Sequence, residues 1–147
     1  MHLTLKFLGD ISREQVEAIL AALRTALSEQ PTLHVHAQGL GAFPNLKRPK
    51  VLWAGLRGEG LVILQEKVES ALVPLDFPRE DRGFTPHLTL GRVRSLRGWE
   101  QVFAVVRQHE HAQFGDSAID RVTVYQSTLR PDGAVYSPLG TVPLQQA

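Results

Sequence analysis

The chain has 147 residues, a length that suits one domain with a substantial core. It contains no cysteine, which excludes disulfides and thiolate metal ligands, and its 43% hydrophobic and 21% charged residues are ordinary for a globular protein. Lys6 and Asp10 interrupt the short apolar start and no apolar run could span a bilayer, so we expect a soluble, cytoplasmic protein with no membrane partner.

The net charge of +1 is the sum of an uneven distribution of charged residues. Between Gln30 and Gly58 there is no acidic residue but there are four basic ones, and between Asp81 and Glu100 there are four arginines and no acid. Basic stretches without acids favour a phosphate-bearing partner. For any single arginine, a position in a solvated loop is the more common explanation.

Strands and helices are predicted to alternate along the chain. Hydrophobic periodicity predicts helices over residues 13–28, 60–73 and 99–109, the first of which begins at a capping box of Ser12 and Gln15. Strands are predicted over 2–5, 33–40, 51–56, 87–90, 119–128 and 134–139. Turn residues predict loops over 41–49 and 74–82. A turn over 130–133, with Pro131 at its second position, joins the last two strands.

The tetrapeptide His-Leu-Thr-Leu occurs twice, at residues 2–5 and again at residues 87–90. In a strand, successive side chains point to opposite faces, so the His and Thr of each copy share one face while the leucines enter the core on the other. If the two strands face each other, two imidazoles and two hydroxyls converge on one small anionic group.

A purely structural explanation of this repeat is also available. One His-x-Thr in a strand carries little information, because Thr is common in strands and His is often half-exposed, and a duplicated structural unit needs only its leucines for the core. The repeat nevertheless keeps its polar face in a chain with only six histidines. A chemical role is therefore favoured over a structural one.

The two halves of the chain share a pattern of elements. The second half runs strand, helix, His-x-Thr strand, helix and hairpin, whereas the first half begins directly with its His-x-Thr strand. The symmetry predicts that a leading strand and helix, which would precede His2, are absent from this chain.

Four further histidines lie outside the repeated motif, and the sequence favours no catalytic or metal-binding role for them. His34 and His36 share one face of the predicted strand over 33–40 and could share a metal ion, but no third ligand is evident, so an exposed polar face is the favoured interpretation. His109 and His111 lie near the end of a predicted helix and are expected to face solvent or to compensate its dipole. We predict no metal site.

The chain resembles the two-histidine phosphoesterase superfamily. The resemblance lies in the repeated His-Leu-Thr-Leu motif, in Phe43-Pro44, in Pro49-x-Val51-Leu52-Trp53 and in Gly133-x-x-Tyr136. Within this superfamily, the chain is most similar to the RNA 2′,3′-cyclic phosphodiesterases, also called 2′-5′ RNA ligase-like proteins, and the resemblance covers essentially residues 1–147 as a single domain. It implies an α+β, bilobal and pseudo-symmetric fold, in which two antiparallel sheets are flanked by helices and the active-site cleft lies between the lobes. The leading strand and helix usual in the family have no counterpart here.

The residue types in the motif suit the opening of a 2′,3′-cyclic phosphate. This hydrolysis needs a base that takes a proton from water and an acid that protonates the departing ribose oxygen. Two histidines can do both near neutral pH, since an unperturbed imidazole titrates near pH ~6.5, and each proton transfer is typically worth about 10²- to 10⁴-fold in rate. Threonine hydroxyls can donate to the non-bridging oxygens, where charge develops, so no metal or cofactor is needed.

The resemblance implies a role for each residue of the pair of motifs. His87 is the base that activates water, and His2 is the acid that protonates the 3′ oxygen, which leaves a 2′-phosphate; the reversed assignment is chemically equivalent. Thr4 and Thr89 hold the phosphate. Arg92 resembles the phosphate-contacting arginine of the family.

Two features near the motif depend on local geometry. Arg92 lies three residues beyond Thr89, so a regular strand would point the two side chains to opposite faces, and the strand must end or bulge at Gly91 for both to reach one phosphate. Phe43 or Trp53 could stack on a base, although aromatic residues in such positions are more often part of the core.

Two other functions are kept beside hydrolysis. The protein could bind nucleotides or RNA ends without turnover, or it could be an ATP-independent 2′-5′ RNA ligase that runs the same step backwards. The absence of a Gly-x-x-x-x-Gly-Lys loop argues against a ligase driven by a nucleotide. In each case the expected partner is an RNA end or a nucleotide with a 2′,3′-cyclic phosphate, bound by a monomer.

Overall fold

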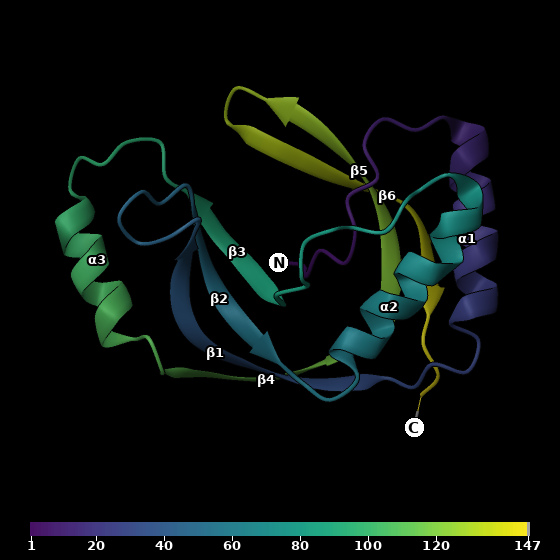
Figure 1. Ribbon diagram of the computed structural model, residues 1–147, viewed down its shortest axis with the longest axis horizontal. Helices are drawn as coiled ribbons and strands as arrows, with labels where there is room; N and C mark the ends of the chain where they lie inside the picture. Colours follow the sequence, from purple (N-terminus) through teal and green to yellow (C-terminus); the bar gives the residue numbers. More distant parts are fainter. Residues whose placement is uncertain (147) are drawn as a thin grey trace. The chain divides into compact units, whose positions relative to one another are not determined.

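The computed structural model describes residues 1–146 of the chain. Its elements are α1 (Arg13–Ala26), β1 (Leu33–Phe43), β2 (Val51–Arg57), α2 (Leu61–Leu72), the short 3-10 helix η1 (Val73–Leu75), β3 (His87–Arg92), α3 (Trp99–Gln108), β4 (Gln113–Ile119), β5 (Arg121–Arg130) and β6 (Gly133–Pro143). One sheet has the strand order β3-β2-β1-β4, and β5 and β6 form an antiparallel hairpin (Figure 1). The predicted α+β class with antiparallel sheets is confirmed.

The chain divides into two compact units. Unit 1 consists of Met1–Leu5, His34–Leu61 and Phe84–Ala118, and unit 2 consists of Lys6–Leu33, Val62–Gly83 and Ile119–Ala147. Each unit is therefore assembled from three separate stretches, and neither is a continuous half of the sequence. Both copies of the His-Leu-Thr-Leu motif belong to unit 1.

The register of the sheet in unit 1 defines its two faces. Ala54 of β2 pairs with Leu40 of β1 and with Leu88 of β3, and paired residues of an antiparallel ladder point to the same face. Ala42 and Ala54 on this face are buried, and so is Val106 of α3, the helix that belongs to the same unit. The apolar side of the sheet thus supplies the core of unit 1, which leaves the opposite face to carry polar side chains.

Unit 2 is built around the apolar stripe of α1. The helix begins at the predicted capping box, in which the Ser12 side chain accepts from the Gln15 amide and the Gln15 side chain accepts from the Ser12 amide. The hairpin lies close against α1, because a Cβ on Gly140 of β6 would overlap the Leu20 side chain. The buried apolar residues of the unit include Ile19, Leu20, Leu23, Leu27, Leu64, Val68, Leu72, Val124 and Val142.

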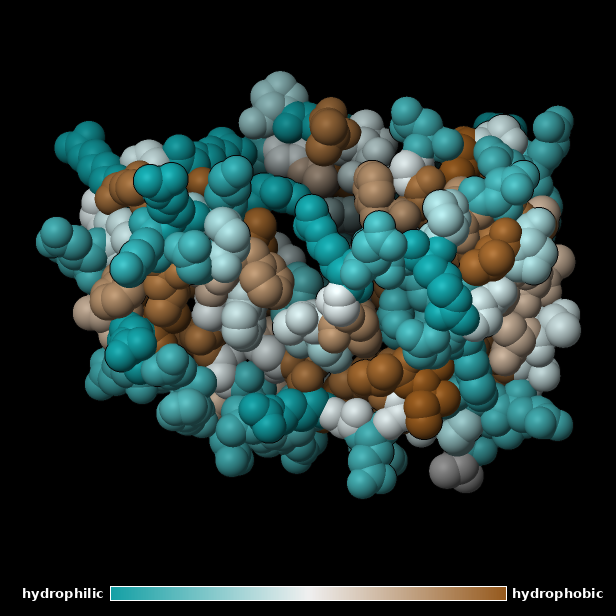
Figure 2. Space-filling model, viewed as in Figure 1, coloured by the Kyte–Doolittle hydropathy of each residue, from teal (hydrophilic) through white to brown (hydrophobic). Residues whose placement is uncertain are grey.

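The surface is mostly polar in the view of Figure 2, with apolar side chains gathered over the first turns of α2. Val62 and Ile63 in that region are 57% and 59% exposed. None of the helices within residues 1–146 is long and apolar enough to cross a membrane.

One observed strand extends further than predicted, and another was not predicted at all. β1 continues through Phe43, where a loop was predicted from Gly41, because Gly41 and Phe43 still pair with Trp53 and Val51 of β2. β4 was not predicted, since its side chains are almost all exposed and it therefore lacks the apolar alternation that reveals a strand in a sequence.

The prediction of a strand over residues 2–5 is wrong. This segment forms one isolated antiparallel bridge, between Leu3 and Leu88 of β3. Lys6, directly after this segment, belongs to unit 2, where its ammonium contacts Glu69 and the Pro78 carbonyl.

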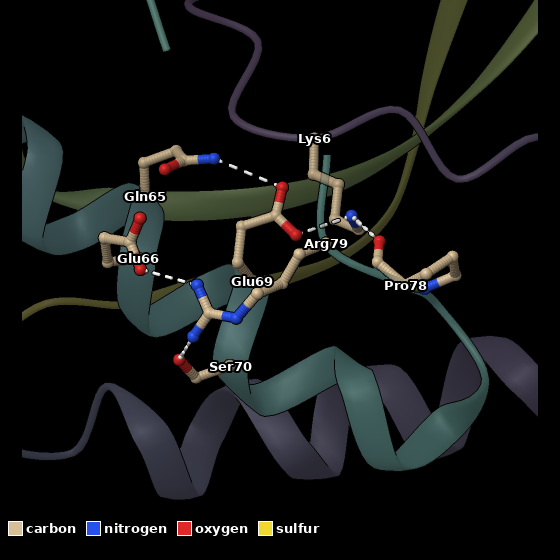
Figure 3. A network of polar contacts seen from close by, with 7 residues as sticks. All are labelled: Lys6, Gln65, Glu66, Glu69, Ser70, Pro78 and Arg79. Carbon is tan, nitrogen blue, oxygen red and sulfur yellow. Dashed lines mark hydrogen bonds and ion pairs between the residues drawn. The ribbon is translucent and has the colours of Figure 1, made fainter. Parts of the chain in front are cut away.

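A buried ion pair in unit 2 holds the chain directly after the first motif (Figure 3). Lys6 Nζ lies 2.7 Å from Glu69 Oε2 of α2, and the two side chains are only 5% and 3% exposed. The Lys6 ammonium also donates to the Pro78 carbonyl at 2.8 Å, and Gln65 Nε2 donates to the other Glu69 oxygen at 3.2 Å. Both carboxylate oxygens therefore have a donor, which offsets part of the cost of burying the charges.

Removal of one partner of this pair should be far more harmful than removal of both. We expect Lys6→Met to lower the free energy of unfolding by about 3–5 kcal/mol, because it leaves the Glu69 carboxylate buried without a cation, and Lys6→Met/Glu69→Met to regain most of that loss. Urea denaturation measures both effects. The exposed pair of Arg79 and Glu66 in Figure 3 is a matched control, and Arg79→Met should cost no more than about 1 kcal/mol. Equal effects of Lys6→Met and Arg79→Met would contradict the prediction.

Candidate active site

The bridge between Leu3 and Leu88 sets the register of the two motifs. Counting one residue outward from an antiparallel bridge places His2 opposite Thr89 and Thr4 opposite His87. In strand β3 side chains alternate, so His87 and Thr89 lie on the face opposite Leu88, and an extended backbone next to the bridge would place His2 and Thr4 on that same face. His87 is half-buried, whereas His2, Thr4 and Thr89 are exposed. The bridge thus makes the segments that carry the four predicted polar residues neighbours within unit 1.

A bulge in β3 decides where Arg92 points. Thr89 pairs with Trp53 of β2, but the next pair joins Gly91 to Leu52, so Leu90 is an extra residue without a partner. Arg92 then pairs with Val51, which lies two residues from Trp53 and on the same face. The bulge therefore returns Arg92 to the face that carries Thr89 and His87. The sequence required an end or a bulge near Gly91, and the bulge lies one residue earlier, at Leu90.

The imidazole of His87 is held in a defined tautomer. Its Nδ1 lies 2.8 Å from the carbonyl oxygen of Thr85, which can only accept a hydrogen bond, so Nδ1 carries the proton. In the neutral ring the lone pair is then on Nε2. Thr85 precedes Pro86, and its contribution comes from the backbone, so no side-chain pattern in the sequence could have revealed it.

An aromatic pair from β1 and β2 packs beside His87, and one of its two rings contacts the imidazole. The Phe43 ring meets the imidazole edge to face, with ring centroids 4.9 Å apart, and Phe43 contacts Trp53 at 5.3 Å. Both aromatic residues are half-buried, so they combine packing with contact to a site residue. Trp53 lies over Gly41, where any Cβ would overlap its ring, so Gly41 is required for this arrangement. Within residues 1–146, the Trp53 indole N–H is buried without a hydrogen-bond acceptor.

The other histidines lie apart from this cluster. His36 Nδ1 is 2.6 Å from Asp116 Oδ1 of β4, a partner that sequence reasoning did not find because the two residues are far apart in the chain. His109 donates from Nδ1 to the Val105 carbonyl at the end of α3, with a separation of 2.8 Å. Among residues 1–146, no group of three or more His, Asp or Glu side chains is arranged to hold a metal ion.

Comparison with known proteins identifies relatives of the chain over most of its length. A family model described as the 2′-5′ RNA ligase superfamily matches residues 1–130. The RNA 2′,3′-cyclic phosphodiesterase of Archaeoglobus fulgidus is 38% identical over 143 residues, which cover 95% of this chain and 77% of the relative. The protein of the same name from Methanocaldococcus jannaschii is 32% identical over 136 residues, which cover 92% of this chain and 76% of the relative.

Solved structures resemble the chain as well. The crystal structure of TT0787 from Thermus thermophilus superposes with a TM-score of 0.80 at 27% identity, and the match covers 97% of this chain and 77% of that protein. The structure of Escherichia coli LigT in complex with 3′-AMP has a TM-score of 0.70 at 26% identity, with 99% and 77% of the two chains covered.

The close contact between the Trp53 ring and Gly41 can be tested with a pair of glycine variants. We expect Gly41→Ala to displace the Trp53 ring and to lower the free energy of unfolding by about 1–3 kcal/mol, the usual cost of overpacking. Gly91→Ala in β3 is the control, because a Cβ there meets no atom within 4 Å, and it should change stability by no more than about 0.5 kcal/mol. Chemical denaturation gives the stabilities, and near-ultraviolet circular dichroism reports the tryptophan environment. If both variants behaved alike, the close contact would be unimportant.

Proposed function

Since the chain belongs to the 2′-5′ RNA ligase superfamily, we propose that it is a metal-independent RNA 2′,3′-cyclic phosphodiesterase. In this proposal it hydrolyses the cyclic phosphate at an RNA end to a 2′-phosphate. The observation that carries the proposal is the bridge between Leu3 and Leu88, which makes the two His-Leu-Thr-Leu motifs neighbours with their polar faces on one side. The relatives named for this activity support the choice of substrate.

His87 is the general base in this mechanism. A base must offer a lone pair to water, and the hydrogen bond from Nδ1 to the Thr85 carbonyl leaves that lone pair on Nε2. The same bond, together with the edge of the Phe43 ring, restricts rotation of the imidazole. Proton transfer from water to Nε2 then accompanies the attack of the water oxygen on phosphorus.

His2 is the general acid, and the hydroxyls and the arginine stabilise charge. As the bond between phosphorus and the 3′ oxygen breaks, His2 donates a proton to that oxygen, and the phosphate remains on the 2′ oxygen. Thr4 and Thr89 donate hydrogen bonds to the non-bridging oxygens. Arg92, which the bulge directs to their face, adds a positive charge where negative charge develops.

A second candidate function is ATP-independent ligation, in which a 5′-hydroxyl of RNA attacks the cyclic phosphate in place of water and a 2′-5′ bond forms. The description of the matching family, the 2′-5′ RNA ligase superfamily, supports ligation as an alternative to hydrolysis. The base takes the proton of the 5′-hydroxyl as it would take that of water, and the acid still protonates the departing 3′ oxygen, so each residue keeps its role. The two reactions are therefore distinguished by their products: hydrolysis leaves the length of the strand unchanged, whereas ligation yields a longer strand. A protein that binds the cyclic end without either product would be a binding module.

The proposed chemistry is tested with an oligonucleotide that ends in a 2′,3′-cyclic phosphate, incubated in excess EDTA. We expect the wild-type chain to convert the end to a 2′-phosphate, and His87→Ala and His2→Ala each to lower the rate by about 10²- to 10⁴-fold, because each removes one proton transfer. Chromatography against 2′- and 3′-phosphate standards identifies the product.

The control for these variants is His111→Ala, which removes an exposed histidine outside the candidate site. It should react at the wild-type rate, and far-ultraviolet circular dichroism should be the same for all of the variants. Wild-type turnover by a chain that lacks both His2 and His87 would eliminate the mechanism. Loss of wild-type activity in EDTA would eliminate the claim of metal independence.

The bulge makes a separate prediction for Arg92. We expect Arg92→Ala to lower kcat/KM by roughly 10-fold or more, because a hydrogen bond from a charged donor to the phosphate is worth about 1.5–3 kcal/mol. Arg107→Ala, on α3, is the matched control and should retain the wild-type kcat/KM. Equal kinetic constants for Arg92→Ala and wild type would mean that Arg92 does not contact the substrate.

A further inference from the structure

An open depression of about 710 Å³ lies on unit 1, outside the group of residues assigned above. Its volume is in the range of small-molecule sites, roughly 300–1,000 Å³. Five of the residues that line it have polar, titratable side chains: His34, His36, Arg57, Glu59 and Asp116. Such a concentration of hydrogen-bonding groups in one depression is a reason to ask what it binds.

The strand register connects this depression to the candidate active site. His87 of β3 pairs with Gly55 of β2, and Arg57 lies two residues further along β2, so Arg57 and His87 share a face of the sheet. They are diagonal neighbours across two strands, a relation that separates residues by about 7–8 Å and that long side chains can bridge. His36 of β1 pairs directly with Arg57 and points to the same face. Gly55, between them and His87, adds no side chain to the surface.

The side chains that line the depression differ in whether their hydrogen-bonding groups are already engaged within the protein. The Asp116 carboxylate is engaged by His36 Nδ1 at 2.6 Å, and this contact orients the imidazole so that Nε2 is turned away from the carboxylate. Among residues 1–146, no hydrogen bond or ion pair from the Arg57 guanidinium is found, and the Arg57 side chain is exposed. The N–H donors of the Arg57 guanidinium are therefore available to a ligand, and Arg57 is a diagonal neighbour of His87 in the sheet.

We propose that this depression is a second nucleotide subsite, which binds the nucleotide on the 5′ side of the one that carries the cyclic phosphate. Arg57 binds the phosphodiester that joins the two nucleotides, and His36, oriented by Asp116, binds the ribose 2′-hydroxyl of the preceding nucleotide. This inference rests on the proposed function, because the terminal nucleotide must first be placed at His87.

The mixed charge of the depression fits a nucleotide better than a free anion. The carboxylates of Glu59 and Asp116 can accept hydrogen bonds from ribose hydroxyls and base amino groups, which a free phosphate ion does not carry. A single cation, Arg57, matches the single charge of one phosphodiester. The subsite therefore selects a strand of RNA over a mononucleotide or a phosphate ion.

The test compares the affinities of two product-like ligands, adenosine 2′-phosphate and the dinucleotide ApA with a terminal 2′-phosphate, by titration calorimetry. We expect wild type to bind the dinucleotide at least about tenfold more tightly, as expected when a charged donor gains a hydrogen bond. In Arg57→Ala the ratio of the two affinities should fall to within about threefold of one. Arg107→Ala, the matched arginine on α3, should keep the wild-type ratio.

The salt dependence provides a readout that a structural role of Arg57 would not change. For the dinucleotide, the slope of log K against log salt should be smaller by about 0.7 in Arg57→Ala than in wild type, since one phosphate contact with a single strand is lost. A wild-type ratio near one, or a ratio that Arg57→Ala leaves unchanged, would overturn the subsite.

The ribose contact is tested with the same dinucleotide carrying 2′-deoxyribose in its first nucleotide. Wild type should bind this ligand more weakly than the all-ribose dinucleotide, and His36→Ala should bind the two equally. Equal binding of both by wild type would overturn the role of His36. All of these measurements report binding, so they test the subsite even if the chain fails to hydrolyse a cyclic phosphate, and that failure would count against the proposed function alone.

Discussion

The antiparallel bridge between Leu3 and Leu88 is the contact on which the candidate site depends. It joins two segments that are far apart in the chain, and it needs only one pair of backbone partners to do so. Once that pair is set, an extended backbone next to it would place the leucines on one face and the histidines and threonines of both motifs on the other. A shift of this register by one residue would turn one motif over and separate its histidine from the other motif.

A bulge in β3 and a glycine in β1 position the side chains around His87. The extra residue at Leu90 returns Arg92 to the face of Thr89, which a regular strand would not do. The absence of a side chain at Gly41 makes room for the Trp53 ring, and Phe43 fills the space between that ring and His87. The candidate base is thus held by packing and by a backbone carbonyl at once, and this is the kind of support that reduces the cost of ordering a catalytic group during reaction.

The polar residues near the first motif divide into two roles. Lys6 follows the motif directly after Leu5, yet its ammonium is buried in unit 2 against Glu69 and the Pro78 carbonyl, which makes it structural. Arg57, by contrast, is exposed on the sheet face that carries His87, without a carboxylate partner among residues 1–146. Burial and pairing, and not the sign of the charge, distinguish the two side chains: Lys6 is buried against a carboxylate, and Arg57 is exposed to solvent.

The sequence by itself determined the helices, most strands and the identity of the candidate site residues, because each depends on a short-range signal: the capping box at Ser12, the apolar stripe of α1, and the repeated His-Leu-Thr-Leu. It also predicted that the strand must end or bulge at Gly91 if Thr89 and Arg92, which resembles the family's phosphate-contacting arginine, are to reach one phosphate. Only the tertiary structure decided the site of the bulge, the strand β4, the single bridge in place of a first strand, and the partners Thr85 and Asp116. Those features arise from pairing between distant segments and from backbone groups, and neither leaves a periodic pattern in the sequence.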